Sequence, residues 1–281
     1  MGVTIVTDTG SDLVGADATR LGIEVVPLWI VLGEDRYRDG VDIDRATFFR
    51  RVGAGEIPTT APPTPEQCRD VFARVTGAGN DVVAIVLSSG ISQTYANALA
   101  AAKEFGARVQ VVDSLGSAGT ETLLALYALE LAKAGNSASE IAKRIDPKAL
   151  RCATYFAMHD LATLGRSGRL PPAVVALGSI TNVSLVLRYN EEGKIVPAGQ
   201  SFSFEKTCEL MVDAVVRAIG HAQSARVSFG HVQAAEQAET LKNMFQAKLG
   251  HAPAQQYTYE ASLTIATHQG LGAVGIYAIV P

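Results

Sequence analysis

Short apolar runs rich in β-branched residues alternate with longer segments of helical periodicity through the first half of the chain. The strands that this pattern predicts are Val3–Thr7, Val25–Val31, Val82–Leu87 and Val109–Val112. The predicted helices, several of which follow Ser, Asp or Pro in a capping position, are Asp44–Val52, Pro65–Thr76, Ser92–Phe105 and Gly119–Ala134. Strands that alternate with helices are typical of a parallel sheet covered by helices. We therefore predict an N-terminal α/β domain over residues 1–150.

The pattern changes after the polar stretch Gly135–Lys148. The segment SLVLRYNEEGKIVPAGQ predicts two strands joined by an Asn-Glu-Glu-Gly turn. The other elements predicted here are a strand at Cys152–Met158, helices at Glu205–Ala222 and Val232–Leu249, and a last strand at Val274–Val280. We therefore predict a second α/β domain, with a mixed sheet, over residues 151–281.

The composition narrows the class of protein. Of the 281 residues, 48% are hydrophobic and 19% are charged, so the chain can fill two domain cores and is not disordered. The formal net charge of −4 gives no basic excess, which argues against a nucleic-acid-binding protein. The widely spaced Cys68, Cys152 and Cys208 suit a reducing compartment and offer no metal-ligand pair. Because MGVTIVTDTGSDL lacks the basic start and long apolar run of a signal peptide, we expect a cytoplasmic protein.

One segment, DVVAIVLSSGISQTYANALAAAKEF, is a candidate anion site because a strand ends in a hydroxyl-rich turn and passes directly into a helix. The first N–H groups of a helix are unpaired, and its dipole favours negative charge there. The same turn supplies hydroxyl donors from Ser88, Ser89, Ser92 and Thr94. Two alternatives stay open. The first is that Ser92 only caps the helix. The second is that one serine is a catalytic nucleophile, although the segment lacks the Gly-x-Ser-x-Gly elbow.

A second candidate for ligand contact is the segment GEIPTTAPPTPEQ, which places Thr59 and Thr60 before a proline-stiffened loop that leads into the helix at Pro65. Prolines restrict the backbone before binding, so a hydroxyl in this loop loses less entropy when it contacts a ligand. The alternative is an ordinary loop in which Thr64 caps the following helix.

Near the C-terminus, Gly270–Gly275 (GLGAVG) matches the dinucleotide-binding fingerprint literally. That fingerprint requires a following helix, whereas only a short β-forming stretch remains, so we predict no nucleotide site. The glycines instead permit close backbone approach and leave His268 exposed at the edge of a crevice, although a lone histidine is more often structural. We interpret Asp8, Asp12 and Asp113 as turn and cap residues, because no histidine or second acid stands at a fixed spacing from them.

Several segments, in order and at matching spacings over nearly the whole chain, resemble the DegV family of bacterial fatty-acid-binding proteins. They are TDTGSDL, VVPLWIVLGEDRYRDGVDI, PTTAPPTP, LSSGISQTYANA, VVDSLGSAGTETLL, DLATLGRSGRL and THQGLGAVG. The resemblance implies a long-chain fatty acid such as palmitate, stearate or oleate, buried between two α/β domains. It implies that Thr60, Ser92 and His268 hold the carboxylate, and we add the neighbouring Thr59 and Ser89 to the candidate ligand-binding residues.

In such proteins a separate ATP-dependent kinase phosphorylates the bound carboxylate, and the acyl phosphate feeds phospholipid synthesis. The resemblance thus implies a carrier subunit of fatty acid kinase, with no cofactor, metal or catalytic machinery of its own and with only transient membrane contact. The lack of a Gly-rich phosphate loop with its lysine agrees with that division of labour. Arg166 and Arg169, in LGRSGRL, are candidate contacts for the kinase, and the alternative is that they form a solvated surface.

The chain departs from the family's pattern in a few places. The family's Thr-Ser-Gln-Pro is Thr60-Ala61-Pro62-Pro63 here, and Leu-Ser-Gly-Thr is Ile91-Ser92-Gln93-Thr94, so both hydroxyls are kept. The family's lysine–proline pair is replaced by Val183 and Ser184, and a basic residue common after the hairpin falls near Phe202. If basic side chains at these positions dock the kinase, the departures put that partnership in doubt. Two alternative functions remain: a small-molecule hydrolase or transferase that uses a serine, and a lipid-sensing regulatory module without phosphorylation.

Overall fold

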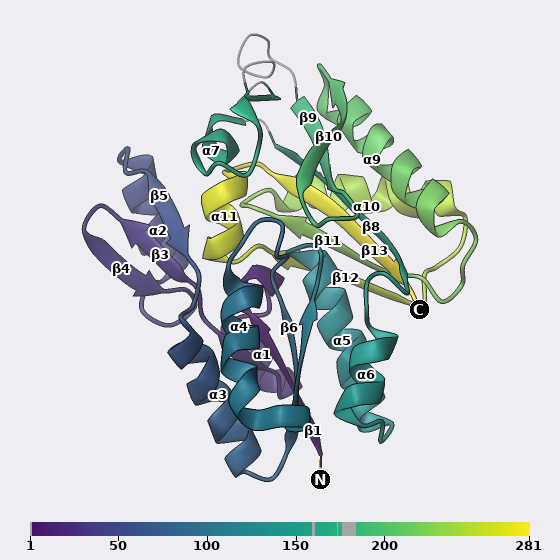
Figure 1. Ribbon diagram of the computed structural model, residues 1–281. Helices are drawn as coiled ribbons and strands as arrows, with labels where there is room; N and C mark the ends of the chain where they lie inside the picture. The colour runs from purple at the N-terminus through teal and green to yellow at the C-terminus, as the bar shows by residue number, and fades with distance from the viewer. Residues whose placement is uncertain (1, 159–160, 173, 176–183) are drawn as a thin grey trace.

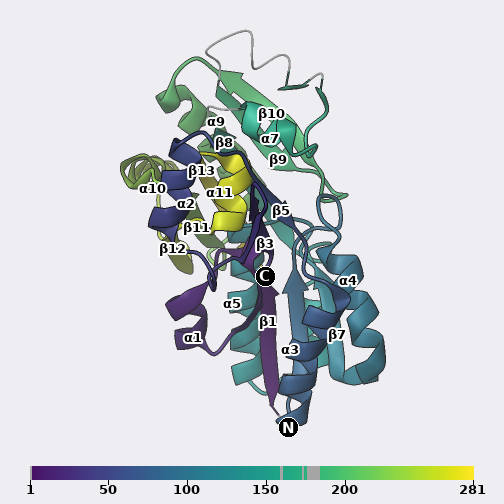
Figure 2. The same cartoon turned by 90° about the vertical axis from the view of Figure 1, so that its left-hand side faces the viewer.

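The computed structural model of the chain describes residues 2–158, 161–172, 174–175 and 184–281. Figure 1 shows two main sheets, the parallel one in the lower part of the molecule and the larger one in the upper part. A side view shows helix α11 (Leu263–Gln269) at the level where the two parts meet (Figure 2). Val183, which the sequence singled out, lies outside the described residues.

The four-stranded sheet is parallel throughout and has the order β2-β1-β6-β7. Its strands are β1 (Val3–Asp8), β2 (Glu24–Val26), β6 (Asp81–Val86) and β7 (Val109–Asp113). Along β6, Val82 and Ala84 face one hydrophobic cluster, whereas Val83 and Ile85 face another. A strand that is buried on both faces reads as a continuous apolar run, which is why the sequence predicts β6 well.

A smaller antiparallel sheet, in the order β4-β3-β5, stands beside the parallel sheet. Its strands are β3 (Trp29–Leu32), β4 (Asp35–Arg38) and β5 (Pro58–Ala61). The prediction of one strand over Val25–Val31 is wrong, because β2 and β3 belong to different sheets and Pro27, which lacks an N–H, stands between them. Strand β5, which contains Thr60 and was not predicted, pairs with β3 at the edge of this sheet.

The six-stranded sheet is mixed and has the order β10-β9-β8-β13-β11-β12. Its strands are β8 (Arg151–Met158), β9 (Ser184–Tyr189), β10 (Ile195–Ser201), β11 (Arg226–His231), β12 (Gln255–Glu260) and β13 (Val274–Val280). Only β11 and β12 are parallel neighbours, whereas the other pairs are antiparallel. The predicted α/β class with a mixed second sheet is therefore confirmed, although β11 and β12 were not predicted.

Helices cover both faces of each main sheet. α3 (Pro65–Gly77) and α4 (Thr94–Ala102) share a hydrophobic cluster with one face of the parallel sheet. The other face packs on α5 (Gly119–Lys133) and α6 (Ala138–Arg144). α5 also packs on β11 and β13, so it is shared between the two sheets. The outer face of the six-stranded sheet is covered by α9 (Phe204–Ile219) and α10 (Ala235–Leu249).

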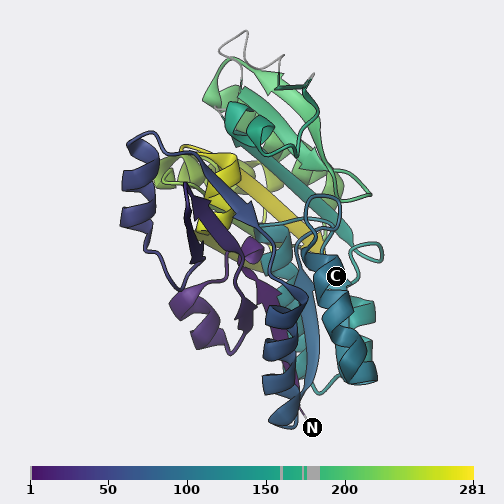
Figure 3. The same cartoon turned by 60° about the vertical axis from the view of Figure 1, so that its left-hand side comes forward.

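Three short helices complete the description: α1 (Gly15–Leu21), α2 (Arg45–Gly53) and α7 (Leu161–Arg166). Figure 3 shows the small sheet, in purple to blue, beside the yellow α11, and β3 and β5 both contact that helix. The predicted helix Ser92–Phe105 is wrong at both ends, because α4 begins at Thr94 and ends at Ala102. From Lys103 the chain continues as a 3₁₀ turn, in which Gly106 has a φ of +56°. Since one hydrophobic cluster joins α5 to both main sheets, the domain boundary near residue 150 stays a prediction.

Among the described residues, none of the helices combines the length and the apolar character that crossing a membrane requires.

Candidate functional site

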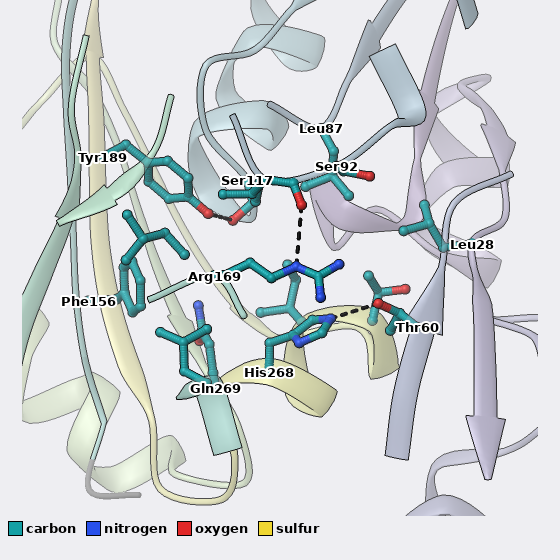
Figure 4. A pocket seen from close by; sticks show the side chains of 15 residues that line it. Leu28, Thr60, Leu87, Ser92, Ser117, Phe156, Arg169, Tyr189, His268 and Gln269 are labelled. Carbon is teal, nitrogen blue, oxygen red and sulfur yellow. Dashed lines mark hydrogen bonds between the residues drawn. The ribbon is translucent and has the colours of Figure 1, made fainter. Parts of the chain in front are cut away.

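A small cavity of about 50 Å³ lies where the two halves of the chain meet (Figure 4). Its apolar walls come from Leu28, Leu87, Ile91, Phe156, Leu164, Ile195 and Ile265. Its polar groups come from Thr60, Ser92, Ser117, Arg169, Tyr189, Thr264, His268 and Gln269. An apolar pocket with a few convergent polar groups is typical of a small-molecule site. The lining therefore joins the predicted residues Thr60, Ser92 and His268 in one place.

Helix α11 carries His268 into the cavity wall. The helix begins after Ser262, whose hydroxyl accepts the N–H of Ile265 at 3.2 Å. Carboxylates from the first half of the chain accept further N–H groups of this turn: Asp12 accepts from Ser262 at 2.7 Å and Asp39 accepts from Thr264 at 2.8 Å. Because these bonds fix the start of the helix, they also fix the position of His268 one turn later.

Strand β5 presents Thr60 to that histidine. Thr60 pairs with Ile30 of β3, and its hydroxyl lies 2.7 Å from Nε2 of His268. Side chains alternate along a strand, so the neighbouring Thr59 points away from the cavity and is exposed. Thr59 lines a separate open cleft of about 440 Å³.

The turn before α4 supplies Ser92. Its hydroxyl lies 2.8 Å from the Thr94 hydroxyl and accepts the Thr94 N–H at 3.2 Å, so Ser92 both caps the turn and lines the cavity. Ser88 does not line the cavity, because its hydroxyl donates to the Gly193 carbonyl oxygen at 2.8 Å. Ser89 is exposed and lines a second open cleft, of about 680 Å³, which Ser92 also borders.

Arg169 extends across the middle of the cavity (Figure 4). Its Nε donates to the Ile91 carbonyl oxygen at 3.3 Å and its Nη1 donates to the Ser167 carbonyl oxygen. Within the described part of the chain, no carboxylate forms an ion pair with this half-buried guanidinium, and burial lowers its pKa. A partly buried cation without a counter-ion is costly, so this position favours an anionic ligand.

The electrostatics of His268 fit the same ligand. Burial and the nearby Arg169 charge lower the pKa of His268 from 6.5 to about 4. The ring is therefore neutral at pH 7 and can either accept from Thr60 or donate to it, depending on its tautomer. The prediction that His268 is exposed at a crevice edge is wrong, because the ring is largely buried in the cavity wall.

The two predicted arginines lie in different places, and the GLGAVG segment forms a turn. Arg166 lies on the exposed surface and donates to Thr163 at 3.0 Å, whereas its predicted companion Arg169 lies in the cavity. The GLGAVG segment follows α11 and leads into β13, so it does not connect a strand to a helix. Gly270 and Gly272 have φ values of +73° and +80°, which a turn here requires.

Ser117, Phe156 and Tyr189 line the cavity without having been predicted. Their loops and strands come from both halves of the chain, and the hydroxyls of Ser117 and Tyr189 lie 2.8 Å apart. No short motif marks such residues. The only signal in the sequence is that Tyr189 ends the predicted strand SLVLRY directly before a turn.

A group of buried acids, the acidic cluster of Asp8, Asp12, Asp39 and Glu121, lies near the cavity but does not line it. Burial raises the pKa of Asp12 to about 7 and raises those of the other three. Asp8 caps a short 3₁₀ turn by accepting the N–H of Gly10 at 2.6 Å, as the sequence predicted for a cap residue. In the described ranges, no group of three or more His, Cys, Asp or Glu side chains could hold a metal ion.

Comparison with known proteins adds independent findings. The family model described as "Uncharacterised protein, DegV family" matches residues 2–280. A DegV domain-containing protein of Halalkalibacterium halodurans is 30% identical over 281 residues, which cover 98% of this chain and 97% of that protein. Protein DegV of Bacillus subtilis is 29% identical over 280 residues and 98% of each chain.

Solved structures give the same result for the fold. A DegV family protein from Thermus thermophilus, described as fatty-acid binding, superposes with a TM-score of 0.90 at 29% identity over the full length of both chains. DegV from Bacillus subtilis, described as a fatty acid binding protein, superposes with a TM-score of 0.85 at 28% identity, also over both full lengths.

Proposed function

Because this chain belongs to the DegV family, we propose that it binds one long-chain fatty acid in the cavity between its two main sheets. Palmitate, stearate and oleate are the ligands that we expect. The related proteins of Thermus thermophilus and Bacillus subtilis, which are described as fatty-acid binding, support this assignment.

The observation that carries the proposal is the guanidinium of Arg169, which has no carboxylate partner among the described residues and lies in a cavity with largely apolar walls. A carboxylate bound there gains a charge-assisted hydrogen bond, which is stronger than a bond between neutral groups. The hydroxyls of Thr60 and Ser92 and the neutral imidazole of His268 line the same cavity and can donate to the carboxylate. Four convergent groups of this kind favour one acid head group.

The apolar walls would hold the alkyl tail. Each buried methylene contributes roughly 0.8 kcal/mol to the binding free energy. For a long acyl chain, this sum exceeds the entropy cost of ordering the chain and the protein. The cavity, at about 50 Å³, has room for a few water molecules only. We therefore expect the walls, including the flexible Arg169 side chain, to move apart when the acid binds.

We further propose that a separate ATP-dependent kinase phosphorylates the bound carboxylate, which would feed phospholipid synthesis in the cytoplasm. The head-group end supports this, because Ser92 and Arg169 border both the cavity and the open cleft of about 680 Å³. A phosphate donor could approach the carboxylate from that cleft. Lys194 also lines this cleft and is the one basic residue besides Arg169 among its described lining; it forms an ion pair with Glu192 at 2.8 Å.

A serine hydrolase is less well supported. A nucleophilic serine needs a base within hydrogen-bond reach, whereas His268 bonds to Thr60 and Ser92 bonds to Thr94. A lipid-sensing module without phosphorylation would use the same cavity. Failure of purified bacterial fatty acid kinases to phosphorylate the bound acid would favour that module over the carrier.

Mass spectrometry tests the binding proposal directly. The protein is purified, denatured and extracted, and the released acids are quantified against the amount of protein. We expect close to one fatty acid per chain, either retained from the cell or taken up from added palmitate or oleate. If the purified protein holds no fatty acid and also takes up neither palmitate nor oleate, the proposal is wrong.

A double variant tests the head-group assignment. Thr60→Ala with Ser92→Ala removes two hydrogen bonds to a charged group, and we expect acid binding to weaken by about 2 to 4 kcal/mol. Thr59→Ala with Ser89→Ala is the matched control, because both hydroxyls belong to exposed neighbours that do not line the cavity. Equal affinities of the two double variants in a titration with a fluorescent fatty acid would reject the assignment.

A further inference from the structure

Tyr189, the last residue of β9, separates the cavity from another cleft. Its ring lines the cavity (Figure 4), and the same residue also lines an open cleft of about 580 Å³. That cleft is otherwise walled by Leu115, Thr120, Thr154, Arg188 and several neighbours. Tyr189 alone lines both spaces, among the residues that the structure describes. Removal of this one ring would therefore join the two spaces.

Both halves of the chain fix the ring in place. The Tyr189 hydroxyl shares a hydrogen bond of 2.8 Å with Ser117, which belongs to the first half. Its ring centroid lies 6.2 Å from that of Phe156 on β8, and its backbone pairs with Ile195 on β10. A ring with these three contacts is a fixed wall, whereas the long side chain of Arg169 can move.

The arrangement of the cavity gives the direction of the acyl chain. Arg169 and His268 border the open cleft near Thr59, and Ser92 and Arg169 border the cleft near Ser89. The proposed head-group residues thus stand at the open end. Tyr189 and Phe156 lie on the side of the cavity opposite Thr60 (Figure 4). A chain anchored by its carboxylate at the open end extends toward these two rings.

We infer that Tyr189 sets the maximum length of the acyl chain that this protein accepts. This inference rests on the proposed fatty-acid function. An acid whose terminal methyl reaches the ring fits, and a longer acid must either displace the ring or leave methylenes outside the cavity. The ring also shields the chain end from the cleft beyond it, which is lined by charged side chains of Lys148, Arg188 and Glu191.

Competition among acids of different length tests the inference. Equimolar palmitate, stearate, arachidate and behenate, delivered from cyclodextrin, are offered to the intact protein, and the bound acids are quantified by mass spectrometry. Tyr189→Ala should raise the ratio of bound behenate to bound palmitate about tenfold or more, since each further buried methylene contributes about fourfold. Tyr189→Phe keeps the wall and removes only the hydroxyl, so its length profile should match that of the native protein.

The outcomes separate the two proposals. Unchanged length profiles in Tyr189→Ala and Tyr189→Val, with normal loading, would overturn the role of Tyr189 and leave fatty-acid binding intact. Absence of any bound acid in the native protein would overturn the proposed function itself. If the alanine variant does not fold, Tyr189→Val, which suits a strand and still shortens the side chain, carries the test.

Discussion

Two polar regions that lie close together differ in how their charged groups are paired. One is the cavity mouth, formed by Thr60, Ser92, Arg169 and His268, and the other is the acidic cluster. In the mouth, Arg169 is a cation without a carboxylate partner among the described residues, and the hydroxyls around it are neutral. In the acidic cluster, the carboxylates accept N–H groups of the chain itself, as Asp8 does from Leu87 at 2.8 Å and Asp12 does from Ser262. Each acid of the cluster thus accepts at least one bond from the chain itself, although one oxygen of Asp12 and one of Glu121 have no partner among the described residues, whereas the cation of the mouth calls for an anion from outside.

This difference assigns separate roles to the two regions. The acidic cluster joins segments that are distant in the chain: Asp12 and Ser262 stand 250 positions apart. The mouth also joins distant segments, through the bond between Thr60 and His268, but its cation bonds only to carbonyl oxygens among the described residues. Changes in the mouth should therefore alter ligand affinity with little effect on stability, and changes in the cluster should do the reverse.

The largest expected effect is on the mouth. Arg169→Met keeps the length and apolar stem of the side chain but removes the cation, so we expect fatty-acid binding to weaken by about 3 kcal/mol, roughly a hundredfold. Isothermal titration with oleate measures the loss, and unfolding in urea should change little. Arg166→Met is the control, because that arginine is exposed and outside the cavity. A loss in Arg166→Met equal to that in Arg169→Met would contradict the role of the mouth.

The second expected effect is on the cluster. Asp12→Asn keeps the acceptor for Ser262 and suits the backbone, since Asn tolerates the φ of +63° at this position. Because burial raises the pKa of Asp12 to about 7, the folded protein holds a proton that the unfolded chain releases above about pH 4. The stabilising effect of that proton is complete below about pH 4 and is lost as the pH rises to 7.

Asn stays neutral at every pH, so we expect Asp12→Asn to exceed the native protein in unfolding free energy by about 2 kcal/mol at pH 8 and by less at pH 6. Urea unfolding at the two pH values measures this. The lowered pKa of His268 acts in the opposite direction between about pH 4 and 6.5, but both proteins contain His268, so its contribution cancels in the difference between them. A stability difference that does not depend on pH would show that Asp12 is ionised in the fold.

The smallest expected effect concerns a bond that joins the two halves. Ser88→Ala removes the hydroxyl that donates to Gly193 at the tip of the β9–β10 hairpin, and we expect a loss of about 1 kcal/mol in unfolding free energy. Oleate affinity should change less than threefold, because Ser88 does not line the cavity. The exposed Ser89 is the matched position, and Ser89→Ala should leave both quantities unchanged.

The sequence predicted the parts of this comparison that depend on local pattern. Ser92 was found because a strand that ends in hydroxyls before a helix is visible within a single segment, and Asp8 was interpreted as a cap for the same local reason. Strand β13 was predicted with its observed limits, because its apolar run lies between a glycine-rich turn and the last residue.

The parts that depend on distant contacts were not predictable. The strand that contains Thr60 was not predicted, because its pairing partner Ile30 lies in a strand that Pro27 separates from β2. Arg169 was predicted, together with Arg166, to contact the kinase or to form a solvated surface, since nothing in LGRSGRL distinguishes the two arginines. The cross-chain role of Asp12 depends on Ser262, and no spacing rule connects residues so far apart.

The most direct test of the central claim uses oleate labelled with ¹³C at the carboxyl carbon. NMR of an equimolar complex should give one bound carboxyl resonance, distinct from that of free oleate, which saturates at one equivalent. The resonance should keep the shift of an ionised carboxylate below the pH at which free oleate protonates, because Arg169 stabilises the charged form. In Arg169→Met that resistance to protonation should disappear. A bound carboxyl that titrates like the free acid in the native protein, or that never saturates, would contradict the account.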